Sequence, residues 1–126
     1  RAQENLQKAI SIFKSVGEID VGQSMIVQNK IVLGLEAIEG TDKLITRCKD
    51  YKGSGDRGVL VKFSKYKQSN ILDIPTIGEN TIRLLKDCDY EGLYLEKDRC
   101  LIIDKEKTID LANQYQIFIS TCNKIE

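Results

Sequence analysis

The sequence predicts a single α/β domain with a mixed β-sheet, two β-hairpins and flanking helices. Apolar residues recur at helical spacing in some segments and form strand-sized runs in others, and the two kinds of segment alternate along the chain. Two pairs of the strand-sized runs are separated by short polar turns, the pattern of a hairpin. Because hairpins are antiparallel, the sheet is not expected to be purely parallel, which argues against a simple Rossmann unit.

Four segments are predicted to be helices. The first covers residues 3–16, where apolar side chains recur every three or four positions, and Gly17 follows as a stop signal. Thr41 or Asp42 is expected to cap the second helix, and Asp104 the fourth. The three later helices are expected over 43–49, from Glu79 or Asn80 to 88, and over 104–114.

The predicted strands are short apolar runs. The runs 25–27 and 31–35 form the first hairpin, and 92–95 and 100–103 form the second. The clearest buried strand covers 59–63, the last strand covers 117–119, and the glycine-rich segment 51–58 is a loop.

Composition excludes several classes of protein. Hydrophobic residues make up 41% and charged residues 30%, as in ordinary globular proteins, and 19 basic residues balance 19 acidic ones. No overall field therefore attracts nucleic acid, and the absence of histidine excludes Ser-His and Cys-His nucleophiles. The four widely spaced cysteines are expected to be free thiols of a reducing cytoplasm rather than zinc ligands. No apolar run approaches the roughly 20 residues that span a bilayer.

The first candidate site is the acidic loop 36–42, between a predicted strand and a predicted helix. It holds Glu36, Glu39 and Asp42, with Gly40 and Thr41 between the last two. A helix N-terminus suits a phosphate, and carboxylates beside it suit Mg²⁺ bridging to that phosphate. Simple helix capping with solvated glutamates would also explain the pattern, and the residues alone leave both interpretations open.

The second candidate is the loop 73–78, which also leads into a helix. Asp73 stands near Pro75, Thr76 and Gly78, and such a carboxylate can bind a metal or position water for attack on phosphorus. A proline or Asx turn is the alternative interpretation.

Basic and amide side chains could complete a site. Lys62, near the end of the buried strand, and Lys65 and Lys67 after it would suit a clamp on a diphosphate, although exposed lysines need no special explanation. Gln23 precedes the first hairpin and could donate a hydrogen bond to a ligand.

Four ordered blocks resemble a known family. They are residues 20–23, 32–42, 58–62 with Lys65, and 73–78. Together they are similar to the C-terminal domain of LpxI-type UDP-2,3-diacylglucosamine pyrophosphatases, and the resemblance extends over about residues 13–118.

The resemblance implies a metal-dependent hydrolysis of UDP-2,3-diacylglucosamine to UMP and 2,3-diacylglucosamine 1-phosphate in lipid A biosynthesis. Asp73 would be catalytic, and Asp73 and Asp42 would bind Mg²⁺ or Mn²⁺. The residues that would bind substrate are Gln23, Glu36, Glu39, Gly40, Thr41, Asp42, Lys62, Lys65, Thr76 and Gly78.

The same resemblance implies a domain organisation, partners and a cellular location. Residues 1–126 would be the C-terminal catalytic domain of a two-domain enzyme, and the start on Arg1 indicates that a further segment precedes them. The expected partners are the acylated sugar nucleotide and an N-terminal domain of the same protein, without nucleic acid; a homo-oligomer is compatible with the sequence. The expected location is the cytoplasm, with peripheral contact to the inner membrane through the lipid substrate.

Three positions depart from the family pattern. Tyr66 replaces a proline, and Ser69 and Ile71 replace an aspartate and an arginine near the second loop. Loss of the arginine would remove charge stabilisation from a diphosphate. The alternative function is therefore a catalytically degenerate domain that binds an acylated sugar nucleotide or serves assembly.

Overall fold

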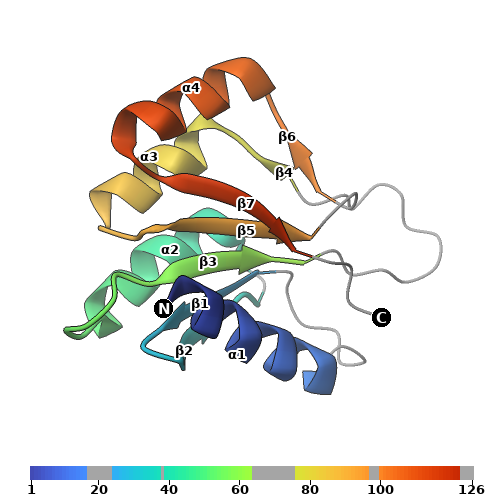
Figure 1. Ribbon diagram of the computed structural model, residues 1–126, viewed down its shortest axis with the longest axis vertical. Helices are drawn as coiled ribbons and strands as arrows, with labels where there is room; N and C mark the ends of the chain where they lie inside the picture. The colour runs from blue at the N-terminus through green and yellow to red at the C-terminus, as the bar shows by residue number, and fades with distance from the viewer. Residues whose placement is uncertain (17–23, 38, 64–75, 97–99, 123–126) are drawn as a thin grey trace.

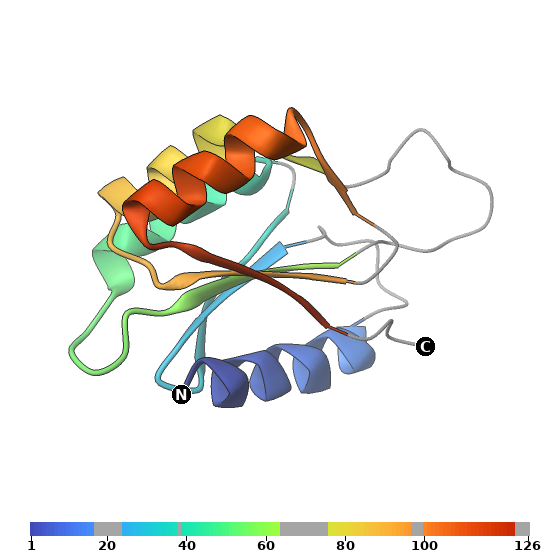
Figure 2. The same cartoon turned by 45° about the horizontal axis from the view of Figure 1, so that its top comes forward.

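The computed structural model describes residues 1–16, 24–37, 39–63, 76–96 and 100–122. These form three layers, with one helix on one face of a five-stranded sheet and three helices on the other (Figures 1 and 2). The helices are α1 (Ala2–Val16), α2 (Thr41–Cys48), α3 (Glu79–Asp87) and α4 (Lys105–Tyr115), and η1 (Lys49–Tyr51) extends α2. The strands are β1 (Ser24–Gln28), β2 (Ile31–Leu35), β3 (Val59–Lys62), β4 (Thr76–Ile77), β5 (Gly92–Glu96), β6 (Leu101–Ile102) and β7 (Phe118–Cys122).

The main sheet is mixed and has the strand order β2-β1-β3-β5-β7. Strand β1 pairs antiparallel with β2 and β3, whereas β3, β5 and β7 are parallel. The α/β class and the mixed sheet are thus confirmed. In the part of the chain that the structure describes, no helix is long and apolar enough to cross a bilayer.

The first hairpin is confirmed, and its turn has a local cause. Asn29 and Lys30 form a two-residue loop in which φ is 53° and 62°, the left-handed pair that matches the twist of the strands. The backbone N–H of Asn29 donates to both carboxylate oxygens of Asp56, at 3.2 and 3.1 Å. The loop before β3 therefore anchors this turn.

The second predicted hairpin is wrong. Strand β5 pairs in parallel with β3 on one side and β7 on the other, so neither of its edges is left for residues 100–103. Strand β6 instead joins β4 in a separate two-stranded parallel sheet. All five residues of β5 are buried, as expected for a central parallel strand, and a polar turn after such a strand does not show where the chain goes next.

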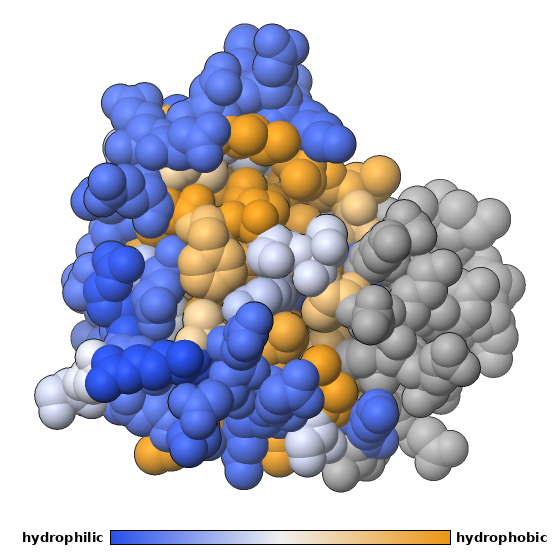
Figure 3. All heavy atoms as spheres, viewed as in Figure 1, coloured by the Kyte–Doolittle hydropathy of each residue, from blue (hydrophilic) through white to orange (hydrophobic). Residues whose placement is uncertain are grey.

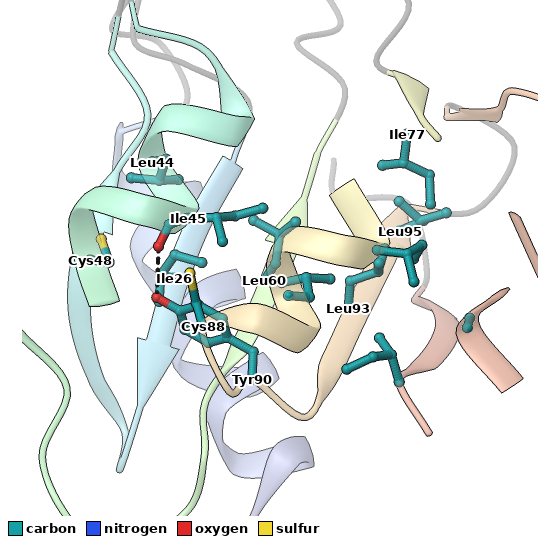
Figure 4. Close-up of a cluster of buried hydrophobic side chains, with 14 residues drawn as sticks. Ile26, Leu44, Ile45, Cys48, Leu60, Ile77, Cys88, Tyr90, Leu93 and Leu95 are labelled. Atoms are coloured by element: carbon teal, nitrogen blue, oxygen red, sulfur yellow. Dashed lines mark hydrogen bonds between the residues drawn. The ribbon is translucent and has the colours of Figure 1, made fainter. Parts of the chain in front are cut away.

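Alternate residues of the strands divide the core in two. Ile26, Leu60 and Leu93 face helices α2, α3 and α4, where the Tyr90 hydroxyl also donates to the carbonyl of Ile45 (Figure 4). On the other face Met25, Val61 and Tyr94 pack in the cluster that includes α1, and Phe13 stacks on Phe63 with ring centroids 4.1 Å apart. This alternation places Ser24 and Lys62 on the same face as Ile26 and Leu60.

The predicted cap of α2 is wrong, and that of α4 is confirmed in its position. Gly40, not Thr41 or Asp42, occupies the N-cap position of α2, with φ at 89°, and no side chain caps this helix. Asp104 does occupy the N-cap position of α4, but its side chain makes no capping hydrogen bond. Thr41 and Asp42 are the first two residues of α2, and their side chains bind other elements instead.

Candidate functional site

Polar residues meet at the edge of the sheet where the parallel strands end. Lys62 is the last residue of β3, and Ser24, the first residue of the antiparallel β1, is its register partner. Glu36 directly follows β2, and its backbone N–H donates to the Ser24 carbonyl at 2.8 Å. In open α/β sheets ligands bind outside the carboxyl ends of the strands, so the topology marks this edge as the candidate site.

The hydroxyl of Thr41 joins three of these side chains, and we call Thr41, Ser24, Glu36 and Lys62 the Thr41 cluster. Lys62 Nζ donates to Thr41 Oγ1 at 2.7 Å, and Thr41 Oγ1 donates to Glu36 Oε1 at 3.2 Å. Ser24 Oγ lies 3.0 Å from the same hydroxyl. Because a hydroxyl has one proton and two acceptor lone pairs, Ser24 is the donor in that contact.

Lys62 is the unusual member of the cluster because only 6% of it is exposed. Within the described ranges, no carboxylate lies within ion-pair distance of its ammonium. Burial lowers the pKa of Lys62, and the charges of Glu36, Cys100 and Asp42 only partly oppose that shift. A bound anion would relieve this desolvated charge.

Asp42 lies in the first turn of α2, and its carboxylate contacts the first turn of α3. Asn80 Nδ2 donates to Asp42 Oδ2 at 2.8 Å, and Thr81 Oγ1 donates to Asp42 Oδ1 at 3.1 Å. The two helices therefore approach each other at their N-termini through one carboxylate. The sequence interpretation did not assign Asn80 and Thr81 to the site, and the only local signal was that both are polar and lie within three residues of Gly78.

Glu39 has a different environment from the rest of the acidic loop. Its Oε2 lies 2.9 Å from Arg47 Nε, and its Oε1 accepts the backbone N–H of Ala37 at 2.7 Å. The backbone hydrogen bond from Ala37, followed by the charge of Arg47, lowers the pKa of Glu39. These contacts hold the loop together and leave Glu39 apart from the Thr41 cluster.

Thr76 lies on the small sheet and Gly78 directly follows its strand β4, both beside two exposed aliphatic residues. Thr76 and Leu101 are register partners and share its exposed face, and a Cβ at Gly78 would lie 3.7 Å from Cβ of Ile103. Leu101 and Ile103 are each 54% exposed. We call these four residues the outer face of the small sheet; Figure 3 shows apolar residues gathered in this region.

The outer face of the small sheet lies close to the Thr41 cluster. Cys100, directly before β6, donates its thiol to the carbonyl of Lys62 at 3.8 Å. Gly78 is the N-cap residue of α3, whose next residues include the two that hold Asp42. A polar region and an aliphatic region therefore adjoin at one edge of the domain.

The structure thus brings together some of the predicted site residues and separates others. Glu36, Thr41 and Lys62 share one cluster, Asp42 lies one residue further on, and Glu39 is turned to Arg47. Ser24 was missed because a serine at the start of a strand carries no local signal. Gln23, Lys65, Ile71 and Asp73 lie outside the described residues.

Among the described residues, few carboxylates lie near the edge. Within the described residues, no three acidic or thiol side chains gather closely enough to hold a metal ion. Mg²⁺ is commonly bound through one or two carboxylates together with the phosphates of a substrate. The donor set therefore fits an ion shared with a phosphorylated ligand better than an ion enclosed by protein alone.

The topology and the polar edge define a mixed-sheet α/β domain whose candidate site lies at the carboxyl ends of its parallel strands. The family model for the LpxI C-terminal domain matches residues 1–120, and the chain belongs to this family. It is 34% identical over 121 residues to the UDP-2,3-diacylglucosamine pyrophosphatase LpxI of Caulobacter vibrioides. The match covers 91% of this chain and 43% of that protein, so the chain spans less than half the length of this relative.

Proposed function

We propose that the protein containing this chain hydrolyses the diphosphate of UDP-2,3-diacylglucosamine, giving UMP and 2,3-diacylglucosamine 1-phosphate for lipid A biosynthesis. The observation that carries the proposal is the buried Lys62 ammonium bound to Thr41 at the carboxyl edge of the sheet. Membership of the LpxI C-terminal domain family, and the name of the Caulobacter relative, supply the identity of the substrate.

The Thr41 cluster supports binding of a diphosphate. A desolvated cation interacts strongly with an anion because little water screens the pair. Thr41 begins α2, and the free N–H groups of a first helical turn favour phosphate oxygens. Lys62 and this turn would together hold the diphosphate, with Ser24 and Glu36 fixing the Thr41 hydroxyl.

For the chemical step, we assign the role of general base to Asp73 on the resemblance of its loop to the family motif. Asp73 accepts a proton from water, and the water oxygen forms a bond to the phosphorus next to the sugar. The bond from that phosphorus to the bridging oxygen breaks, and UMP leaves with the electron pair. Mg²⁺ or Mn²⁺, held by Asp42 and Asp73, would supply neutralisation of the diphosphate charge.

The outer face of the small sheet supports an acylated substrate rather than a plain sugar nucleotide. Leu101 and Ile103 present aliphatic surface next to the polar edge. An amphipathic ligand with its diphosphate at Lys62 could lay an acyl chain on this surface, where removal of both from water is favourable.

The remaining expectations stay part of the proposal. A companion domain of the same protein would enclose the lipid portion of the substrate. Because the substrate carries acyl chains, it would bring the enzyme to the cytoplasmic side of the membrane that supplies the substrate. Peripheral contact would then occur through the substrate.

A degenerate binding domain is the second candidate function, and one observation favours it. Ile71 and Ser69 stand where the family pattern has an arginine and an aspartate. Without the arginine, less positive charge would surround the diphosphate in the transition state. Such a protein would bind the acylated sugar nucleotide and leave it intact.

The experiment incubates the full-length protein with UDP-2,3-diacylglucosamine and Mg²⁺ or Mn²⁺ in water enriched in oxygen-18. We expect UMP to be released and the label to enter the sugar 1-phosphate, because attack occurs on the phosphorus next to the sugar. An Asp73→Asn variant should bind the substrate without turnover. Binding without turnover by the wild-type protein would instead support the degenerate domain.

A further inference from the structure

We infer that Asn80 and Thr81 are positioning residues, which hold the Asp42 carboxylate in place for the reaction. The inference deepens the proposed function and rests on it for its kinetic consequence. Neither residue belongs to the motifs that suggested the site, and both come from the start of a different helix.

The geometry assigns one donor to each oxygen of Asp42. Asn80 donates to Oδ2 at 2.8 Å and Thr81 donates to Oδ1 at 3.1 Å, so both the position and the rotation of the carboxylate are fixed. Thr81 is only 6% exposed, which makes its hydroxyl an internal contact rather than a surface one. A carboxylate has about four lone-pair sites, so Asp42 keeps acceptor capacity for a further partner.

The two hydrogen bonds also connect the two loops that the sequence singled out. Asp42 follows Thr41, the residue that Lys62 contacts. Asn80 and Thr81 follow Gly78, which closes the loop that begins at Asp73. The contact therefore sets the C-terminal end of the second loop at a defined place relative to the Thr41 cluster.

This arrangement has a definite kinetic consequence. A residue that orients another group acts on the geometry of the reacting atoms, so its loss lowers kcat more than it raises KM. Partners that orient metal-binding or catalytic groups commonly change affinity or rate by about 10–100-fold when removed. A purely structural role would instead show as lower thermal stability with an unchanged rate per folded molecule.

The test uses the full-length protein with Mg²⁺. Thr81→Val removes the hydroxyl at nearly constant volume, and Asn80→Ala removes the amide. We expect each to lower kcat about tenfold or more with little change in KM, and we expect Thr81→Ser, which keeps the hydroxyl, to recover most of the rate. Glu79→Gln is the matched control, because Glu79 pairs with Arg83 in the same helical turn and is not among the donors to Asp42.

A double-mutant cycle separates positioning from other effects. If Thr81 acts through Asp42, Thr81→Val causes no further loss in an Asp42→Ala background. The inference is overturned if kcat is unchanged in both Asn80→Ala and Thr81→Val. It is also overturned if Thr81→Val lowers kcat by the same factor in the Asp42→Ala background as in the wild-type protein.

A structural readout makes the test independent of turnover. If the wild-type protein does not release UMP, the proposed function fails, and a crystal structure of the Asn80→Ala, Thr81→Val double variant decides the inference. We expect its Asp42 carboxylate to leave the wild-type position. A carboxylate that stays in place overturns the positioning role.

Discussion

The ammonium of Lys62 donates a 2.7 Å hydrogen bond to the hydroxyl of Thr41, which links the end of β3 to the first residue of α2. The sequence interpretation assigned these two residues to separate features, a basic segment and an acidic loop. Their contact places a buried positive charge beside a helix N-terminus. This relationship carries the proposed diphosphate site, and the first predictions concern it.

Removal of the Thr41 hydroxyl should destabilise the domain. Thr41→Val leaves Lys62 and Ser24 without their acceptor and Glu36 without a donor. Buried polar groups left without partners cost about 1–3 kcal/mol. We expect urea denaturation to show a lower free energy of unfolding for Thr41→Val. Thr41→Ser, which keeps the hydroxyl, should largely retain the wild-type value.

Thr46→Val is the matched control for that measurement, because the Thr46 hydroxyl contacts only carbonyls of its own helix in the described residues. An equal effect of the Thr41 and Thr46 variants would contradict the account of the cluster.

Replacement of Lys62 should separate stability from ligand binding. Lys62→Met keeps the length of the side chain and removes a charge whose burial is unfavourable, so stability should be maintained or increased. Binding of UDP, measured by calorimetry on the full-length protein, should weaken because the ammonium no longer faces the diphosphate. Lys86→Met, which changes an exposed lysine in the last turn of α3, should leave UDP binding as it is.

The pH dependence of stability should reveal the buried lysine. Burial lowers the pKa of Lys62 below 10.5, its ordinary value, so above the folded-state pKa the unfolded chain binds this proton more tightly than the folded chain does. Stability therefore rises with pH through the window between the folded-state pKa and 10.5.

The difference in urea midpoint between wild type and Lys62→Met isolates this one group. We expect the urea midpoint of the wild-type protein to rise relative to that of the variant as the pH is raised toward 10.5. A difference that is constant over that range would show that Lys62 is not desolvated in solution.

The outer face of the small sheet gives a prediction about the lipid portion of the substrate. Leu101→Gln combined with Ile103→Gln should raise KM for UDP-2,3-diacylglucosamine about tenfold, since loss of one or two aliphatic contacts is worth about 1–3 kcal/mol. KM for an analogue with very short acyl chains should change little. Ile31→Gln is the control, because Ile31 is 60% exposed but lies at the far end of β2 from Glu36.

The pairing of β5 with β7 can be tested through one glycine. A Cβ on Gly92 would lie 2.5 Å from the carbonyl oxygen of Phe118 and 2.5–2.6 Å from ring carbons of Phe118, on the neighbouring strand. Gly92→Ala should therefore destabilise the domain by about 1–3 kcal/mol, the usual cost of overpacking. Gly53→Ala, where the added carbon meets nothing within 4 Å, should have a far smaller effect on thermal unfolding.

Local patterns predicted much of the fold. The helical periodicity of α1 and the apolar run of β3 were sufficient to predict these two elements, because each of them buries a regular face. The hairpin after β5 was mispredicted because a parallel strand takes its partners from distant segments, here β3 and β7. A polar turn contains no information about that choice.

The candidate site was predicted less completely, for a related reason. The acidic loop does lie at the edge of the sheet, but its residues divide between the Thr41 cluster, the start of α3 and Arg47. Ser24 and Thr81 contribute through contacts with residues 17 and 39 positions away, which no spacing rule reveals. Their roles follow from topology rather than from motif.

The most direct test of the central claim is kcat/KM for UMP release from UDP-2,3-diacylglucosamine by the full-length protein and its Lys62→Met variant, with Mg²⁺ present. We expect turnover by the wild-type protein and a loss of about 100-fold or more in the variant, the usual cost of removing one preorganised donor from the reacting group. A wild-type protein without turnover, or a variant that keeps the wild-type value, would contradict it.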